Sequence, residues 1–263
     1  MKHMSHESFL RWRVFSVLYI GCLFGTIVSF PYVFTLQRDI IADLPIPLSV
    51  LFVSNIIQSA VLFFILVLAG LYLSHKMGLG AYILERWSEG KEIQSHIKAI
   101  LPLSIVLGVL AGILIIFCDV LFSLVAPLES ITIVGTDPEP WMGFLVSFYG
   151  GINEEVLMRF FLVSLIVFVL SHLKKTKDGK PTHLSIWIAI VVAALVFGLG
   201  HLPLTSSLTT ITPVIVLRAL ILNGIGGIIF GWLYWRKGLE SAMTSHFSAD
   251  IVLHAIFPLI ASF

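Results

Sequence analysis

Charged residues are scarce in this chain. Asp, Glu, Lys and Arg make up 12% of its 263 residues, whereas a soluble domain carries about 25%. Cysteine is scarce too: Cys22 and Cys118 both sit inside apolar runs, where they are typical of small core residues and not of a disulfide or metal site. The formal net charge of +1 gives no sign of a nucleic-acid partner. The composition therefore excludes an ordinary soluble domain.

Long apolar runs take the place of the missing charge. The chain is 58% hydrophobic and has a mean hydropathy of +1.01. Runs of about 20 apolar residues recur from end to end, and each is long enough to cross a hydrocarbon core of about 30 Å. No stretch between them is long enough for a soluble domain. We therefore predict an all-α, polytopic transmembrane helix bundle that forms one integral membrane domain, residues 1–263, in contact with the lipid bilayer.

The apolar runs predict seven spans. Their approximate bounds are 14–34, 48–74, 100–126, 141–172, 184–204, 213–235 and 239–261. Charged and proline-rich segments such as Leu44–Pro47, Glu85–Lys98 and Asp137–Pro140 separate them. Two spans exceed the usual length, so we expect them to tilt or kink. The last could also split near Asp250–His254, which would give eight spans.

Basic residues alternate between the predicted loops. The N-terminal tail and every second loop hold most of them: Lys2, Arg11, Arg13, Lys76, Arg86, Lys91, Lys98, Lys174, Lys175, Lys177, Lys180, Arg236 and Lys237. The opposite loops hold Arg38 and the acids Glu129, Asp137 and Glu139. By the positive-inside rule the N-terminus is cytoplasmic and, with seven spans, the C-terminus is outside. We expect the plasma membrane of a prokaryote. The first apolar run is longer than a secretory h-region, so we interpret it as a retained span.

Ionisable residues inside the spans are the informative ones, because a charge at mid-bilayer costs at least about 2.5–3.5 kcal/mol. The first three spans contain Asp119. The others gather in the C-terminal half: Glu154, Glu155, Arg159, His201, Arg218, His246, Asp250 and His254. We therefore expect residues 1–135 to be scaffold, and residues 136–263 to be a catalytic core with the active site among its spans.

The fourth predicted span places two adjacent glutamates side by side. Glu155 and Arg159 are four residues apart, so they share a helix face and can form an ion pair that braces the helix. Glu154 lies about 100° around the helix from Glu155. It cannot easily share the arginine, so we expect a functional role for it.

Histidines and an aspartate supply the rest of the polar set. His201 follows Gly198 and Gly200, and these small residues permit close helix packing. His246, Asp250 and His254 recur every four residues, so they form one stripe that must face the bundle interior or a water-filled cavity. We expect His246 and Asp250 to be functional and His254 to be a satisfied structural group.

This set of side chains suits hydrolysis by activated water. Burial favours the neutral form of a glutamic acid, which makes it a usable general base near neutrality. A histidine can orient the water, and a second histidine with an aspartate can stabilise an oxyanion. No serine or cysteine nucleophile is needed. Two histidines and a carboxylate could instead bind zinc and leave an open position, although the chain lacks His-Glu-x-x-His.

Three motifs follow one another on three predicted helices: Glu154-Glu155-x-x-x-Arg159, Phe197-x-x-x-His201 and His246-x-x-x-Asp250. Over about residues 140–255 the chain resembles the CPBP family of intramembrane proteases. This family includes the type II CAAX prenyl endopeptidases (Rce1-like) and bacterial relatives linked to bacteriocin self-immunity. Each motif is weak alone, but all three in order are specific.

The resemblance implies an intramembrane endopeptidase that cleaves a membrane-associated peptide or protein, either a prenylated CAAX substrate or another. It implies that Glu154 activates water with help from His201, and that Glu155 and Arg159 brace the helix. His246 would form the oxyanion site with residue 250, where the family usually has Asn. A protonated Asp250 could donate as Asn does, whereas an ionised one would repel an oxyanion.

The resemblance leaves rival functions open. Members of this family have been described both as glutamate-dependent and as metalloproteases; we favour the form without a cofactor and keep a zinc-dependent protease as the alternative. A non-enzymatic membrane protein is the other rival, either a bacteriocin-immunity or scaffold protein or a small transporter that uses the polar stripe as a proton relay. No inverted repeat is visible, which disfavours the transporter.

Overall fold

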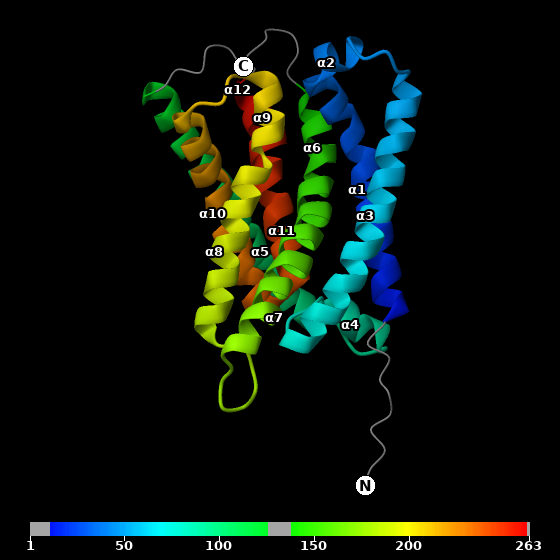
Figure 1. Ribbon diagram of the computed structural model, residues 1–263, viewed down its shortest axis with the longest axis vertical. Helices are drawn as coiled ribbons and strands as arrows, with labels where there is room; N and C mark the ends of the chain where they lie inside the picture. The colour runs from blue at the N-terminus through cyan, green and yellow to red at the C-terminus, as the bar shows by residue number, and fades with distance from the viewer. Residues whose placement is uncertain (1–10, 126–137, 262–263) are drawn as a thin grey trace.

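The computed structural model describes residues 11–125 and 138–261, and within these ranges the chain is helical (Figure 1). Seven helical segments are long and apolar enough to cross a membrane: Trp12–Leu36, Leu48–Met77, Gln94–Leu124, Pro140–Leu173, His183–Leu208, Pro213–Lys237 and Leu239–Ala261. The predicted polytopic all-α bundle is confirmed. The chain is an integral, multi-pass membrane protein.

The first three spans and the sixth are single helices, and the other spans are built from shorter pieces. The first three are α1 (Trp12–Leu36), α3 (Leu48–Met77) and α5 (Gln94–Val125), with α2 (Arg38–Ala42) and α4 (Tyr82–Ser88) between them. The fourth span consists of α6 (Pro140–Phe148), the π-helical segments η1 (Tyr149–Glu154) and η2 (Val156–Val163), and α7 (Ser164–Leu173). The remaining spans consist of α8 (His183–Gly200), α9 (Leu202–Leu208), α10 (Pro213–Lys237), α11 (Leu239–Asp250), the π-helical η3 (Ile251–Ile256) and α12 (Phe257–Ala261).

Several predicted boundaries need correction. The third span begins at Gln94 instead of residue 100, because the helix continues past the apolar run into polar residues. The segment Glu85–Lys98, which we expected to be a break, contains most of α4 and the first turn of α5. The last span is one segment with a π-helical turn, so the eight-span alternative is wrong. The predicted end of the third span at residue 126 lies outside the described residues, as do Lys2, Glu129 and Asp137.

Threonine caps mark where two of the spans begin. The side-chain oxygen of Thr182 accepts a hydrogen bond from the backbone N–H of Ser185 at 3.0 Å. Thr212 does the same for Ile215 at 3.3 Å. Such caps satisfy backbone donors that a helix start leaves without a partner. Pro213, at the first position of α10, needs no hydrogen-bond partner for its nitrogen. Local sequence signals therefore fix these two starts.

Polar contacts between spans hold the bundle together, because lipid offers no hydrophobic drive for helix association. Three such hydrogen bonds join α5 to α11, α7 to α10, and η1 to α1: Ser104–Ser241 at 2.7 Å, Ser164–Tyr234 at 2.7 Å, and Asn153 Nδ2 to the backbone oxygen of Cys22 at 2.8 Å. The third span therefore packs on the C-terminal spans. At its contact with α11, a methyl group on Gly108 would run into the backbone oxygen of Ser245.

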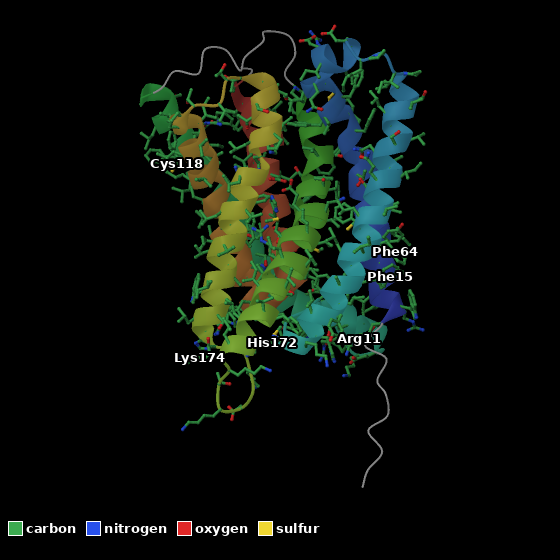
Figure 2. The ribbon with its side chains drawn as sticks, in the orientation of Figure 1. Arg11, Phe15, Phe64, Cys118, His172 and Lys174 are labelled. Carbon is green, nitrogen blue, oxygen red and sulfur yellow. The ribbon has the colours of Figure 1, made fainter. Side chains whose placement is uncertain are left out.

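The bundle has two chemically different ends. We call one end the basic face: α1, α5, α8 and α11 begin there, and α3, α7 and α10 end there (Figure 1). Arg11, His172 and Lys174 lie at the basic face, whereas Cys118 lies toward the opposite face (Figure 2). The division into scaffold and catalytic core stays a prediction.

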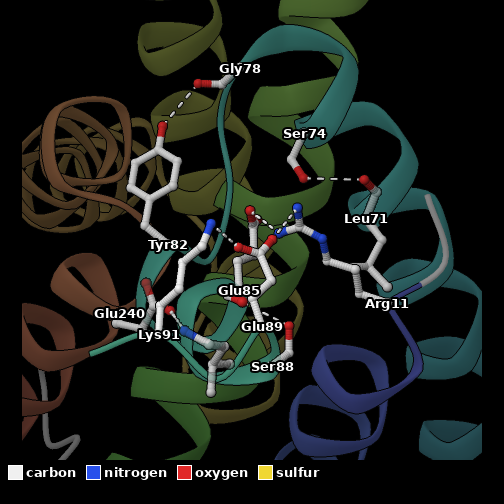
Figure 3. Close-up of polar contacts among 11 residues, drawn as sticks. Arg11, Leu71, Ser74, Gly78, Tyr82, Glu85, Ser88, Glu89, Lys91 and Glu240 are labelled. Atoms are coloured by element: carbon white, nitrogen blue, oxygen red, sulfur yellow. Dashed lines mark hydrogen bonds and ion pairs between the residues drawn. The ribbon is translucent and has the colours of Figure 1, made fainter. Parts of the chain in front are cut away.

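A charged cluster at the basic face ties α4 to its neighbours (Figure 3). Arg11 forms ion pairs with Glu85 at 2.5 Å and with Glu89 at 2.8 Å. Burial raises the pKa of the Glu85 carboxyl, although the Arg11 guanidinium opposes this shift. The backbone N–H of Leu84 donates to Glu240 at 2.8 Å, near the start of α11. The cluster therefore fixes the start of the last span.

Candidate active site

The fourth span departs from a regular α-helix at the motif that contains Glu154, Glu155 and Arg159. The π-helical segments η1 and η2 run from Tyr149 to Val163, interrupted at Glu155. In a π-helix the hydrogen bonds skip one more residue than in an α-helix, and such turns are frequent at functional sites. The motif Glu154-Glu155-x-x-x-Arg159 lies inside this stretch, so its side chains do not follow α-helical spacing strictly.

Glu155 is fully buried and has two basic partners. Its Oε1 atom lies 2.8 Å from Nη1 of Arg159, which is the ion pair expected from their spacing. The same oxygen lies 2.7 Å from Nδ1 of His246, a contact that the sequence did not predict. The Arg159 guanidinium also lies 5.2 Å from the ring centre of Phe197 and 5.4 Å from that of Phe230, within reach of cation–π attraction. Glu155 thus joins the fourth span to the last.

His246 presents its second ring nitrogen to two other carboxyl groups. Its Nε2 atom lies 3.6 Å from Oε2 of Glu154 and 3.6 Å from Oδ1 of Asp250. Its ring stacks on Phe230, with centres 4.6 Å apart. An ionised carboxylate can only accept a hydrogen bond, so Nδ1 donates to Glu155. The orientation of the His246 ring is thereby set, with Nε2 between Glu154 and Asp250.

The ring of His201 is oriented by its own helix. Its Nδ1 atom lies 2.8 Å from the backbone oxygen of Phe197. A carbonyl oxygen only accepts, so Nδ1 carries the proton, and Nε2 of the neutral ring keeps a lone pair. The ring also packs edge to face against Phe197 at 4.8 Å between centres. His201 is thus held in the tautomer that can accept a proton at Nε2.

One cavity of about 550 Å³ brings the four candidate residues together: its wall includes Glu154, His201, His246 and Asp250. A cavity of this size falls within the range of about 300–1,000 Å³ that is usual for small-ligand sites. Glu155 does not line it. The sequence places these four residues on three helices at different depths, and the structure shows that they nevertheless share one space.

Small residues permit this convergence. A methyl group at Gly150 would run into Oδ2 of Asp250 and lie 3.2 Å from Nε2 of His246. At Gly151 it would meet Phe247. The fourth span can therefore approach the last one closely enough for their side chains to meet only because glycine occupies these positions.

The cavity has further polar residues that sequence reasoning did not assign to the site: Tyr32, Asp119, Tyr149, Arg218, Asn223 and His254. Asp119 and Arg218 form an ion pair at 2.6 Å between α5 and α10. Nδ1 of His254 lies 3.3 Å from the hydroxyl oxygen of Tyr32. The sequence signal for Asp119 and Arg218 was their charge inside apolar spans, but nothing in the sequence linked the two.

Comparison with known proteins finds a family similar to part of the chain. The family model for the Rce1-like type II CAAX prenyl endopeptidases matches residues 136–252. This segment is therefore similar to that family. The match suggests a CAAX-type intramembrane protease, which is a peptidase that acts on a membrane-associated substrate. No curated protein and no solved structure matches the chain.

The matched segment contains all four candidate residues and the pair Glu155–Arg159, but the cavity extends beyond it. Tyr32 and Asp119 precede the matched segment and His254 follows it. The first and third spans, outside the family match, therefore supply part of the cavity wall.

A zinc ion would need several donor atoms of the candidate site to converge on one point. Zinc takes His nitrogens and carboxylate oxygens at about 2.0–2.2 Å, usually as a four-coordinate site. Across residues 11–125 and 138–261, no group of three or more His, Cys, Asp or Glu side chains is arranged to hold a metal ion. Nδ1 of His246 and that of His201 are engaged by Glu155 and by a backbone oxygen. The candidate residues therefore do not fit a zinc ion.

Proposed function

We propose that this chain is an intramembrane endopeptidase in which Glu154 activates water to hydrolyse a peptide bond of a membrane-associated substrate. The observation that supports this proposal most directly is the difference in burial between two adjacent glutamates. Glu155 is closed in by Arg159 and His246 and has no exposed side-chain surface, whereas the side chain of Glu154 is 24% exposed and lines the cavity. Of the two glutamates, only Glu154 can contact water and substrate in the cavity.

Charge balance supports the assignment of the other roles. The buried cluster contains three carboxyl groups, on Glu154, Glu155 and Asp250, beside Arg159 and His246. Buried charges must be paired. The cluster is neutral when Arg159 and His246 are positive, both glutamates are negative and Asp250 holds its proton. In this state Asp250 can donate a hydrogen bond, as an asparagine would.

The reaction then needs no covalent intermediate. Glu154 takes a proton from a water molecule, which Nε2 of His201 helps to orient, and the water oxygen bonds to the carbonyl carbon of the substrate. The carbonyl oxygen becomes an oxyanion that accepts hydrogen bonds from Nε2–H of His246 and from protonated Asp250. Glu154 passes its proton to the amine nitrogen as the carbon–nitrogen bond breaks, and the products are an acid and an amine.

We also propose the orientation that the loop charges favour. Within the described residues the basic face carries twelve of the sixteen Lys and Arg residues of the chain, whereas Arg38 is the basic residue at the opposite loops. The basic face is then cytoplasmic and the N-terminus lies inside, in the plasma membrane of a prokaryote.

The test of the function is cleavage by purified protein of a panel of membrane-associated peptides, with and without a prenyl group. We expect wild type to cleave at least one peptide and Glu154→Ala to cleave none. If the panel stays intact with wild type, or if Glu154→Ala cleaves as wild type does, the proposal is wrong. A chelator arm distinguishes the zinc-dependent alternative: we expect activity to survive chelation, and its loss with recovery on adding zinc would support the metal.

A further inference from the structure

We infer that the substrate reaches the cavity from the non-cytoplasmic side of the membrane, so that the substrate is a peptide segment displayed on that side. This inference rests on the proposed function for its substrate, but its geometric part stands on the cavity alone.

The cavity wall comes from one end of each span that lines it. In the spans that leave the basic face, the lining residues lie beyond the midpoint: Tyr32 to Leu36 in α1, Ile115 to Val120 in α5, and Phe197 to Leu204 in α8 and α9. In the fourth span, which runs the other way, they lie before it, from Val146 to Glu154. The cavity thus extends from mid-bundle toward the face opposite the basic one.

Phe230 and His246 form the inner end of the cavity, near the middle of their spans. Between them and the basic face, α10 and α11 contribute completely buried side chains: Leu233, Tyr234, Leu239 and Ala242. Interiors packed in this way leave no passage for a peptide. The site is therefore closed toward the basic face, where the charged cluster around Arg11 and Glu85 lies (Figure 3).

Polar groups continue from the catalytic residues toward the open end. His254 lies one turn beyond Asp250 and contacts Tyr32. The pair Asp119–Arg218 lies in the same wall, with side chains 42% and 23% exposed. Ionisable groups at this depth face water-filled space or one another. Water for the hydrolysis can enter along this wall, and so can a polar peptide backbone.

The basic residues at the ends of the spans indicate on which side of the membrane the cavity opens. Arg11, His172 and Lys174 mark the basic face in Figure 2, and the cavity extends away from them. Under the positive-inside rule the open end faces away from the cytoplasm. A lipidated tail that stays in the cytoplasm would meet the closed end. The fitting substrate is a short peptide segment of a membrane-anchored protein on the non-cytoplasmic side.

Cysteine labelling in oriented membrane vesicles tests the opening without any need for activity. The background carries Cys22→Ala and Cys118→Ala, which removes both native thiols. Single cysteines are then placed in the cavity wall, as Leu204→Cys and Asn223→Cys, and in the exposed basic-face loop, as Lys175→Cys. The probe is a membrane-impermeant maleimide, applied to right-side-out and to inside-out vesicles.

We expect the two cavity cysteines to react in right-side-out vesicles and Lys175→Cys to react only in inside-out vesicles. The inference is overturned if the cavity cysteines react from the same side as Lys175→Cys, from both sides equally, or from neither side. A catalytically dead protein would label in the same way, so failure of the proposed function would not mimic failure here. If a cleaved peptide is in hand, we also expect cleavage when it is added outside right-side-out vesicles and none with inside-out vesicles.

Discussion

Nδ1 of His246 lies 2.7 Å from Oε1 of Glu155, although the two residues are 91 positions apart in the chain. This contact joins the fourth span to the last at the level of the cavity. It gives Glu155 a second basic partner beside Arg159, and it fixes which nitrogen of His246 faces the candidate catalytic carboxyl groups. Glu155 is therefore an organising residue for the site, and it does not line the cavity itself.

Glu155→Gln should destabilise the fold. The substitution leaves Arg159 buried without a negative partner, and loss of one partner of a buried ion pair costs about 3–5 kcal/mol. We expect a clearly lower melting temperature in detergent for Glu155→Gln, whereas Glu154→Gln should melt near wild type because Glu154 is partly exposed. Equal melting temperatures for Glu155→Gln and wild type would show that the ion pair has no such role.

Asp250→Asn should retain peptide cleavage, and Asp250→Ala should lose most of it. An asparagine amide can donate a hydrogen bond to an oxyanion as a protonated carboxylic acid does, whereas alanine cannot. Loss of one oxyanion donor costs about 10²–10³ in turnover. The comparison of kcat for the two variants checks the role of the proton on Asp250, and inactive Asp250→Asn would mean that the carboxylate itself is required.

Gly150→Ala should impair cleavage by about 10²-fold. The added methyl group would run into the Asp250 carboxyl and crowd His246, and displacement of catalytic groups by about 1 Å can cost this much. Gly200→Ala is the matched control, since a methyl group there would meet no atom of the described residues within 4 Å. Wild-type kinetics for Gly150→Ala would show that the close approach of these two spans is unimportant for the site.

His201→Ala should lower kcat by about 10²-fold, as expected when the attacking water loses a group that orients it, without loss of the fold. Its ring hydrogen-bonds within its own helix and is partly exposed, so its removal breaks no contact between spans through that bond. His183→Ala is the control, because His183 lies at the other end of the same span beside Trp235. A fall in melting temperature that matches the fall in activity would instead assign His201 a structural role.

The sequence predicted the spans well because long apolar runs carry a strong signal, and the structure confirms seven of them. It also predicted the contact between Glu155 and Arg159, because two residues four positions apart lie near the same face of a helix. The boundary at Gln94 was missed, since the helix begins in polar residues that precede the apolar run.

Contacts between distant spans could not be predicted from the sequence. The pairs Glu155–His246 and Asp119–Arg218 depend on how helices are rotated and shifted against one another. The direction in which side chains of the fourth span point depends in turn on two π-helical segments. No residue in these segments predicts a π-helical turn. The shared cavity of Glu154 and His201 therefore required the structure.

The central claim is that Glu154, and not its neighbour, activates the water. Its most direct test is the cleavage rate of purified Glu154→Gln in liposomes, measured on a peptide that wild type cleaves. Glu139→Gln serves as control, because Glu139 begins the same span outside the cavity. The account predicts that Glu154→Gln keeps the wild-type melting temperature but loses at least about 10²-fold in rate, while Glu139→Gln cleaves normally. A folded Glu154→Gln that cleaves at the wild-type rate would contradict it.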